Sequence, residues 1–384
     1  MKIFINAVAL KVAGGKSVLS NFLKAISKEG RGHTYYVFLP DDPIYHEFRT
    51  VPHMHMFPTP NFFNKPYFRY FIDHIYLPAK IRSIKPDAVF SMGNVSLPIS
   101  TAPQILLFHM PHPLYPDSAY WQRIGMRKKY FDFLISQITR KFKYASVIAA
   151  QTEAAKVRLE KYYGLGTKTV VIPNAVSLNN MRQVNSTPAP NLLQLKQQLG
   201  DAKVFLCLSR YYEHKNIEVL VDVAERLKAE GTHYKILITI DHNQGKGAQQ
   251  ILNSIEEKGL SDVIINAGNV RMDDIRHIYE MSDALILPTL LESFSGTYVE
   301  AAYFRKPVFT SDYDFAKEIL QENAFYFDPL DAEDIASKLG SIEDRPLIEK
   351  VCAGAFDRIQ QYPDWSSVAA SYLTLIENTT KQYV

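Results

Sequence analysis

Cysteine and long apolar runs are scarce in this chain of 384 residues. The two cysteines, Cys207 and Cys352, argue against a disulfide framework or a cysteine-rich metal site, and both are expected to be small buried side chains. No apolar run reaches the ~18 residues that a spanning helix needs. The opening segment from Ile3 to Leu10 is short and contains Asn6, which is typical of a first strand and not of a signal peptide. We therefore expect the cytoplasm as the compartment.

Composition is that of a globular protein, with 47% apolar and 22% charged residues, and the length suggests two domains. The net charge of +3 hides a division along the chain. Residues 1–180 hold 23 Lys and Arg against 10 Asp and Glu, a charge of +13, whereas the remainder carries −10. Such a division indicates that the first half meets an anionic surface or substrate. Mutual attraction of the two halves is the alternative.

Short apolar segments alternate with amphipathic helical ones, which is typical of an α/β protein with parallel sheets. In the first half we expect strands at residues 2–8, 33–39, 88–91, 105–108, 147–150 and 170–172. In the second half we expect them at residues 204–208, 236–240, 263–266, 284–287 and 307–309.

The turn-rich residues 186–191 indicate a linker between the two sets of strands. We therefore predict a first domain at 1–180, a linker at 181–200, a second domain at 201–362 and a final helix at 363–384. No internal repeat or low-complexity tract interrupts this organisation.

Two carboxylates, Glu292 and Glu300, stand eight positions apart after the expected strand at 284–287. Gly296 and Thr297 are expected to begin a helix, so Glu292 lies in a strand-end loop, where open α/β sheets bind ligands. The backbone N–H groups near Ser295 and Thr297 favour an anion such as phosphate. The carboxylates can accept hydrogen bonds from sugar hydroxyls.

Two cations follow the first strand of the second half. Arg210 and Lys215 are placed to clamp a pyrophosphate, the arginine through its planar fork and the lysine as a point charge. A surface ion pair between Lys215 and Glu213 is the alternative.

Gly14 and Gly15 stand between the first strand and the first helix, where a backbone without side chains lets a phosphate approach. A Walker A motif is excluded, because Leu10 stands where that motif needs glycine. A plain tight turn is the alternative reading.

His109 and His112 follow the expected strand at 105–108 and are expected to face a cleft between the domains. A metal site would need a third ligand, and no adjacent carboxylate or cysteine pattern supplies one, so we expect no metal. A structural role for these histidines is the alternative.

Residues 121–144 are basic and aromatic, with seven Lys and Arg against the single acid Asp132. Phe131, Leu134, Ile135 and Ile138 would form an apolar helical face, and such a helix can lie on anionic lipid. An ordinary helix packed on its own sheet is the alternative. No nucleic-acid module accompanies the patch, so we expect no nucleic-acid partner.

The residues Pro288, Glu292, Phe294 and Glu300 resemble the Glu-x7-Glu signature of retaining glycosyltransferases of family 4, whose two facing Rossmann-like domains form the GT-B fold. The segments 172–176 and 266–270 resemble further parts of that family.

The chain also departs from the family pattern. Ala175 replaces a usual glycine, and Ser293 and Ser295 replace the glycines that commonly flank the phenylalanine, which would narrow the pocket.

The resemblance implies a retaining, metal-independent enzyme with a nucleoside-diphosphate sugar as donor and no cofactor. The donor would bind mainly to the second domain, and a glycan or lipid-linked saccharide acceptor to the first. The implied role is the assembly of surface polysaccharide or lipopolysaccharide, with peripheral attachment to the inner face of the membrane as a further expectation. The final helix would return to the first domain.

The resemblance also implies residue roles. Glu300 would hold the ribose and Glu292 the transferred sugar, with Val270 near the base. His109 would line the donor sugar, and His112 is placed on the acceptor side. The other expected donor contacts are Arg210, Lys215, Gly14, Gly15, Phe294, Ser295, Gly296 and Thr297. A nucleotide-sugar epimerase and a non-catalytic nucleotide-sugar-binding protein remain as alternatives.

Overall fold

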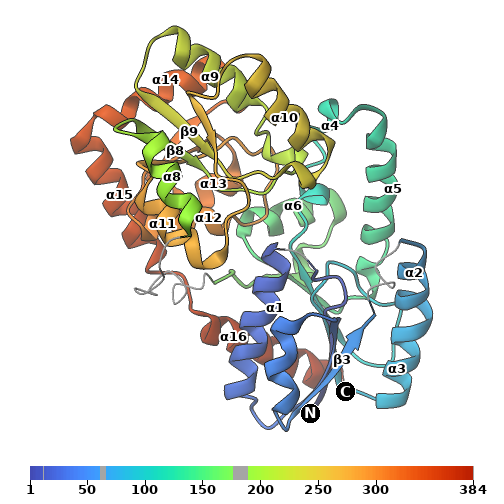
Figure 1. Ribbon diagram of the computed structural model, residues 1–384. Helices are drawn as coiled ribbons and strands as arrows, with labels where there is room; N and C mark the ends of the chain where they lie inside the picture. The colour runs from blue at the N-terminus through green and yellow to red at the C-terminus, as the bar shows by residue number, and fades with distance from the viewer. Residues whose placement is uncertain (12, 61–65, 176–188, 384) are drawn as a thin grey trace. The chain divides into compact units, whose positions relative to one another are not determined.

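The computed structural model of the chain describes residues 1–11, 13–60, 66–175 and 189–383 (Figure 1). The chain divides into two compact units. The first comprises Met1–Pro116, Ile124–Ala175 and Pro363–Val384, and the second comprises Asp117–Arg123 and Val176–Tyr362. Residues 181–188 of the predicted linker lie outside the described residues, and so does Val176 at the end of the segment 172–176.

A parallel sheet of seven strands forms the centre of the first unit, in the order β3-β2-β1-β4-β5-β6-β7. The strands are β1 (Lys2–Asn6), β2 (Thr34–Pro40), β3 (Met54–Thr59), β4 (Ala88–Ser91), β5 (Gln104–Phe108), β6 (Val147–Ala150) and β7 (Thr169–Val171). Every residue of the central strands β4 and β5 is buried, as expected for a parallel sheet that is covered on both faces. In the register, Ile3 pairs with Tyr35 of β2 and with Ala88 of β4.

Helices connect these strands and cover the sheet. They are α1 (Ala13–Lys28), α2 (Pro66–Phe71), the π-helical turn η3 (Ile72–Tyr76), α3 (Leu77–Ile84), α5 (Lys128–Thr139), α6 (Glu153–Tyr163) and α16 (Trp365–Tyr383). Short 3-10 turns also occur in this unit, at η1 (Pro43–Thr50), η4 (His112–Leu114), η5 (Gly125–Arg127), η6 (Phe142–Tyr144) and η7 (Gly166–Lys168).

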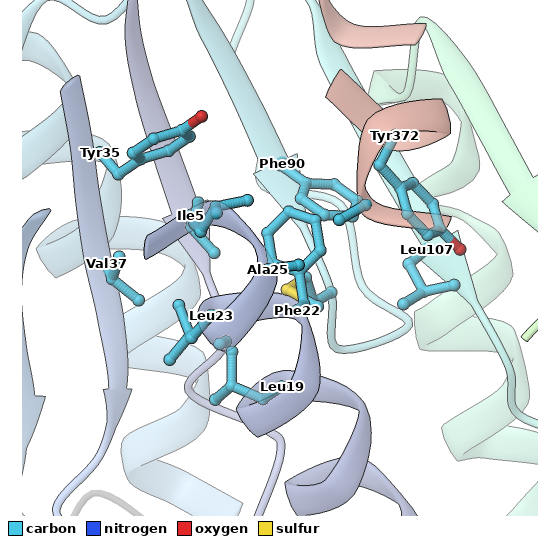
Figure 2. Packing of buried hydrophobic residues seen from close by; sticks show 14 of the residues in the cluster. Ile5, Leu19, Phe22, Leu23, Ala25, Tyr35, Val37, Phe90, Leu107 and Tyr372 are labelled. Atoms are coloured by element: carbon cyan, nitrogen blue, oxygen red, sulfur yellow. The ribbon is translucent and has the colours of Figure 1, made fainter. Parts of the chain in front are cut away.

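The core of the first unit is built from one face of α1 against the sheet. Leu19, Phe22 and Leu23 follow helical spacing and are buried (Figure 2). The Phe22 ring meets Phe90 of β4 edge-on at 5.4 Å and Tyr372 of α16 at 6.1 Å. Each such side chain contributes about 1.5–3 kcal/mol by leaving water. This core therefore holds the strand and loop that precede α1 in place.

The C-terminal helix α16 packs on the first unit beside α1 (Figure 1), as the resemblance predicted. A polar contact fixes its register: a ring nitrogen of His33 lies 2.8 Å from Glu377. Arg31 donates to the Thr374 hydroxyl at 3.0 Å. Burial alone would raise the pKa of Glu377, but the bonds from His33 and Arg31 outweigh it and lower that pKa. The carboxylate therefore stays ionised and paired.

The second unit has a parallel sheet of six strands in the order β10-β9-β8-β11-β12-β13. They are β8 (Lys203–Cys207), β9 (Tyr234–Ile238), β10 (Ile264–Asn266), β11 (Ala284–Leu287), β12 (Val308–Ser311) and β13 (Phe325–Phe327). The helices are α4 (Tyr120–Arg123), α8 (Pro190–Leu199), α9 (Val219–Ala229), α10 (Lys246–Glu257), α11 (Ile275–Glu280), α12 (Gly296–Tyr303), α13 (Asp314–Leu320), α14 (Ala332–Leu339) and α15 (Arg345–Ile359). The two parallel sheets confirm the predicted α/β class.

The structure differs from the sequence prediction in several local features. Helix α1 begins at Ala13, so Gly14 and Gly15 lie in its first turn, and the preceding turn is closed by the Leu10 N–H, which donates to the Ala7 carbonyl at 2.9 Å. The predicted linker contains helix α8. The basic stretch 121–144 is not one helix, because Gly125 adopts a φ of 53°, and only α5 forms a helix of several turns there.

Within the described residues, no helix is long and apolar enough to cross a membrane.

Candidate active site

The strand order of the second sheet reverses between β8 and β11. The chain proceeds from β8 to β9 and β10 on one side, and from β11 to β12 and β13 on the other. The loops that leave the carboxyl ends of β8 and β11 therefore start side by side, at the position where open α/β sheets bind ligands. The first loop carries Arg210 and Lys215, and the second carries Glu292. The fold thus brings these three predicted site residues to one edge of the sheet.

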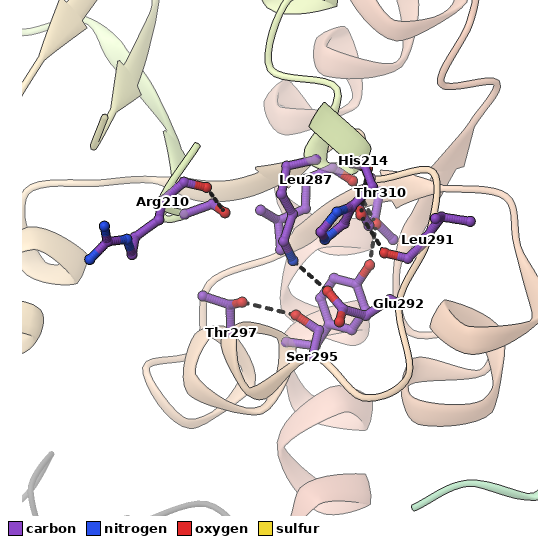
Figure 3. Close-up of polar contacts among 12 residues, drawn as sticks. Arg210, His214, Leu287, Leu291, Glu292, Ser295, Thr297 and Thr310 are labelled. Carbon is purple, nitrogen blue, oxygen red and sulfur yellow. Dashed lines mark hydrogen bonds and ion pairs between the residues drawn. The ribbon is translucent and has the colours of Figure 1, made fainter. Parts of the chain in front are cut away.

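Hydrogen bonds tie the two loops together. The Leu290 N–H donates to the His214 carbonyl at 2.7 Å, and the Thr289 hydroxyl donates to the same carbonyl at 3.2 Å. Lys215 forms an ion pair with Glu292 across the two loops (Figure 3). These contacts fix the backbone that presents the cation and the carboxylate.

The ion pair between Lys215 and Glu292 is shielded from solvent, since the two side chains are 15% and 12% exposed. A charge-assisted hydrogen bond of this kind is stronger than a neutral one. An anionic ligand that contacts Lys215 must therefore share the ammonium group with Glu292 or displace the carboxylate.

Arg210 differs from Lys215 in its exposure to solvent and in its ion pairing. Its side chain is exposed, and its guanidinium group extends away from Glu292 in Figure 3. It forms no ion pair with any residue that the structure describes. The backbone beneath it is fixed, because Thr239 Oγ1 accepts from the Ser209 N–H at 3.0 Å and the Ser209 hydroxyl donates to the Arg210 carbonyl at 2.8 Å. Arg210 is thus a solvent-exposed cation on a loop whose backbone is held by hydrogen bonds.

Helix α12 begins at Gly296, and no side chain in the described part of the chain caps its N-terminus. The first N–H groups of a helix have no partner inside the helix, and the dipole favours an anion there. The Ser295 and Thr297 hydroxyls lie 2.9 Å apart (Figure 3). The Phe294 ring is buried and packs edge-on against Tyr362 at 5.9 Å. The Phe294 ring therefore holds the loop between Glu292 and Gly296 against Tyr362.

Glu300 lies in α12, and the buried Tyr279 contacts it. The Tyr279 hydroxyl lies 3.4 Å from the Glu300 carboxylate and 3.3 Å from the Thr297 carbonyl. Burial raises the pKa of Glu300 to about 7, and the Tyr279 hydroxyl opposes that rise. Glu300 is therefore about half ionised at neutral pH. A ligand hydroxyl that donates to it would favour the carboxylate form.

Val270 lies in the loop after β10 and is partly buried. No contact in the described residues distinguishes it as a binding residue.

The remaining predicted site residues belong to the first unit. The His109 N–H donates to Asn94 Oδ1 at 2.6 Å. The His112 ring stacks on Phe131 with the ring centres 5.2 Å apart. Burial lowers the pKa of both histidines to about 4, so both rings are neutral at pH 7. A neutral imidazole can donate or accept a hydrogen bond but brings no charge to a diphosphate.

The two glycines of α1 differ in their surroundings. A β-carbon on Gly15 would lie 3.2 Å from the Leu10 side chain, whereas one on Gly14 would meet none of the described residues within 4 Å. A side chain at Gly15 would therefore press on Leu10, and one at Gly14 would not meet such a neighbour.

Sequence reasoning missed two residues of the second-unit site. Tyr279 is distant along the chain from Glu300, and nothing in its local sequence indicates the contact. Asn216 is fully buried with a φ of 56°, and its side chain donates to the Pro329 carbonyl at 2.7 Å and bonds to Arg123. Asparagine tolerates a positive φ better than most residues do. An asparagine directly after Lys215 was therefore a usable sequence signal for a turn at this position.

No group of three or more metal-ligating side chains occurs in the part of the chain that the structure describes.

Two parallel sheets, each in a unit of its own and each flanked by helices, define a protein of the GT-B class, with the candidate site at the switch point of the second sheet. Comparison with known families gives the particular family. Residues 12–180 match the Glycosyltransferase Family 4 model, and residues 194–353 match the model of Glycosyl transferases group 1. The chain belongs to the glycosyltransferases that combine these two regions.

Known relatives are distant in sequence. The mannosylfructose-phosphate synthase of Agrobacterium fabrum is 25% identical over 311 residues, which cover 73% of this chain and 65% of that protein. The O-antigen chain mannosyltransferase of Salmonella typhimurium is 23% identical over 245 residues, which cover 63% of this chain and 62% of that protein. The chain thus spans less than two thirds of the length of these relatives.

A solved structure supports the fold over the full length. Anabaena HepE in complex with UDP-glucose superimposes with a TM-score of 0.73, covering 98% of this chain and 100% of that one, at 17% identity. At this sequence identity, the similarity is evidence for the fold alone.

Proposed function

We propose that this chain transfers a sugar from a nucleoside-diphosphate sugar to a glycan or lipid-linked saccharide in the assembly of surface polysaccharide or lipopolysaccharide. The observation that carries the proposal is the meeting of Arg210, Lys215 and Glu292 with the uncapped N-terminus of α12 at one switch point. Cations and free backbone N–H groups suit a diphosphate, and carboxylates suit sugar hydroxyls. The names of two relatives, a mannosyltransferase and a mannosylfructose-phosphate synthase, agree with this chemistry, and so does the UDP-glucose in the solved structure of Anabaena HepE.

The donor would occupy the second unit. Arg210 and Lys215 would hold the diphosphate together with the N–H groups of Gly296 and Thr297. Glu292 would accept hydrogen bonds from the transferred sugar, and Glu300 from the ribose. In the first unit, His109 would line the donor sugar and the start of α1, at Gly14 and Gly15, would approach the diphosphate. His112 is assigned to the acceptor side.

The reaction proposed is retaining and needs no nucleophile from the protein. The bond between the anomeric carbon and the diphosphate oxygen breaks, and the acceptor oxygen forms its bond to the same face of that carbon. The acceptor proton passes to the departing phosphate oxygen. Arg210 and Lys215 stabilise the negative charge that develops on the diphosphate, which is the most effective place for a fixed cation. With two cations there, the proposal requires no metal.

Product analysis tests this proposal against its two alternatives. With donor and a saccharide acceptor, we expect a new glycoside and free nucleoside diphosphate, with the anomeric configuration of the donor retained. The donor is first found by thermal shift, because a ligand that binds only the folded state raises the apparent stability. An altered nucleotide sugar formed without acceptor would identify an epimerase. Tight donor binding without any product would identify a binding protein.

Attachment to anionic membranes is a further part of the proposal, and it rests on an exposed surface of the first unit. Met126, Tyr130 and Phe133 are 93%, 60% and 63% exposed. Arg127 and Lys129 stand among them and are also exposed. Apolar side chains next to basic ones suit an anionic lipid surface. Lys141, also in the basic stretch, is instead only 15% exposed and pairs with the buried Asp73.

We expect the variant Met126→Ser/Lys129→Glu/Phe133→Ser to bind vesicles of anionic lipid at least about tenfold more weakly than the wild type, because it loses apolar contacts and reverses a charge worth ~1 kcal/mol near such a surface. Vesicle sedimentation at two salt concentrations measures this. The control is Lys156→Glu/Val157→Ser on α6, where Val157 is 61% exposed. Equal binding by the two variants would refute the assignment of this surface.

A further inference from the structure

A short segment of the chain between β5 and α5 belongs to the second unit. Residues 117–123, here called the inserted segment, include helix α4, and the chain before and after them belongs to the first unit. Tyr120 and Trp121 of this segment are 2% and 6% exposed, and their rings meet edge-on at 5.0 Å. The Tyr120 N–H donates to the Ser118 hydroxyl at 3.2 Å, which closes the turn into α4. The inserted segment is therefore a packed element with a defined turn.

Arg123 of the inserted segment contacts the residue that follows Lys215. Asn216 ends the 3-10 turn η8 (Glu213–Lys215) with a φ of 56°, and it is fully buried. The Asn216 side-chain N–H donates to the Pro329 carbonyl at 2.7 Å, and the side-chain oxygen accepts from the Arg123 guanidinium. Loss of the arginine would take this donor from the oxygen, and a buried acceptor without a donor is costly. The turn that presents Lys215 is therefore supported by Arg123.

The inserted segment also contacts the loop that carries Glu292. The Ser118 hydroxyl donates to the Leu290 carbonyl at 3.2 Å. The Leu290 N–H donates to the His214 carbonyl of the first loop at 2.7 Å, and the His214 ring meets the Tyr120 ring edge-on at 6.3 Å. One short segment thus bridges the loops after β8 and β11, whose side chains form the shielded ion pair.

We propose that Arg123, acting through Asn216, is a positioning residue for the lysine that binds the donor diphosphate. The inference rests on the proposed transferase function, because it takes Lys215 as a contact of the diphosphate. Without the bond from Arg123, the turn at Asn216 would be held less firmly, and the Lys215 ammonium would be displaced from the diphosphate for more of the time. A displaced cation loses much of its effect, since catalysis needs groups held close to the productive geometry. Ser118 supports the neighbouring loop in the same way.

The first experiment measures the binding of inorganic pyrophosphate by calorimetry in a double-mutant cycle. Arg123→Met removes the donor and keeps the apolar stem, and the protein should stay folded because Arg123 is exposed. We expect this variant to bind pyrophosphate about threefold or more weakly, as is usual for residues of one hydrogen-bond network. In a chain that already carries Lys215→Ala, Arg123→Met should have no further effect, because Arg123 acts through that lysine.

Two results of the cycle would overturn the positioning role. Unchanged affinity in Arg123→Met would show that Lys215 does not depend on Arg123. Full additivity of the losses in Arg123→Met and Lys215→Ala would show that Arg123 contacts the ligand itself.

Matched variants control for the substitution. Gln122→Ala removes an exposed side chain of the same helix, and Lys196→Ala removes an exposed cation of the same unit. Neither should change the affinity for pyrophosphate. Arg123→Lys keeps a donor at the end of the side chain and should retain more affinity than Arg123→Met. Equal losses in Arg123→Lys and Arg123→Met would overturn the hydrogen bond to Asn216 as the cause.

Hydrogen exchange gives a readout that needs no ligand. The Asn216 N–H donates to the Glu213 carbonyl at 3.2 Å, and the Leu290 N–H donates to the other loop. Local opening of either loop exposes these groups to exchange. Arg123→Met should speed the exchange of the Asn216 N–H, and Ser118→Ala that of the Leu290 N–H. Wild-type exchange in both variants would show that the inserted segment does not hold the loops, and would overturn the proposal.

Transfer rates separate a failure of this inference from a failure of the proposed function. With donor and a saccharide acceptor, Arg123→Met should lower kcat by about threefold or more. Normal transfer by Arg123→Met would overturn the positioning role and leave the transferase function intact. Coupling of Arg123 to Lys215 in pyrophosphate binding, in a chain without any transfer activity, would overturn the transferase function alone. Absence of pyrophosphate binding in the wild type would overturn the diphosphate clamp and the positioning role with it.

Discussion

Arg210→Ala and Lys215→Ala are each expected to slow sugar transfer by about 30- to 1,000-fold while the protein stays folded. The two cations lie on the loop after β8, at the switch point, where in the proposed reaction the departing diphosphate would gain negative charge. Loss of one such contact raises the transition-state barrier by ~2–4 kcal/mol. Steady-state rates at saturating and at low donor concentration measure the effect on kcat and on kcat/KM. Near-normal rates for both single variants would contradict the clamp.

We expect the two variants to differ in their effect on the stability of the fold. Arg210 is exposed and has no ion-pair partner among the described residues, so Arg210→Ala should leave the free energy of unfolding within ~0.5 kcal/mol of the wild type. Lys215→Ala removes the partner of Glu292, whose side chain is 12% exposed, and an unpaired charge in such a place is costly. Lys215→Ala should therefore also lower the denaturation midpoint. Arg226→Ala, which breaks an exposed pair with Glu333, is the control for charge loss alone.

The meeting of Arg210, Lys215 and Glu292 could be predicted from the sequence, because each follows an apolar strand and the carboxyl ends of parallel strands share one edge. The ion pair between Lys215 and Glu292 could not be predicted from the sequence. It depends on the order of the strands, which puts β8 next to β11, and on the bonds from the Thr289–Leu290 loop to His214. Sequence separation carries no information about which strands are neighbours.

The strands that the sequence did not predict have weak local patterns. Strand β3 has the sequence MHMFPT, with two histidine or proline interruptions, and it is extended through its pairing with β2 at the sheet edge. Strand β13 has only three residues and pairs with β12. Both depend on a neighbour in space. The α/β alternation was readable because the central strands are buried on both faces and appear as continuous apolar runs.

The second large effect concerns Glu292 and Glu300, which we expect to recognise different parts of one donor. Glu292→Gln should reduce sugar transfer by about tenfold or more, since a hydrogen bond to a charged group contributes ~1.5–3 kcal/mol. It should not weaken the binding of the bare nucleoside diphosphate, because the change removes the carboxylate that competes with the diphosphate for Lys215. Glu300→Gln should weaken both, because the ribose is present in both ligands. Calorimetry with the nucleoside diphosphate and transfer rates on each variant measure the two quantities.

The pH dependence separates a direct role of Glu300 from an indirect one. Its pKa of about 7 in the free protein lies above the usual value for glutamate, because burial disfavours the carboxylate. Ribose hydroxyls that donate to the carboxylate would favour it, so binding should lower the pKa and release a proton near pH 7. The wild-type affinity for the nucleoside diphosphate should then rise by about tenfold between pH 6 and pH 8, relative to Glu300→Gln.

The effect of Glu300 on folding runs in the opposite direction. A folded pKa above the unfolded value means that the protonated residue contributes stability fully below pH ~4.3, and that this contribution is lost as the pH rises through 7. Weaker binding at pH 6 therefore cannot come from partial unfolding at Glu300, where the residue stabilises the fold more than at pH 8. If Glu292→Gln abolishes diphosphate binding while Glu300→Gln binds with the wild-type pH profile, the two roles are assigned the wrong way round.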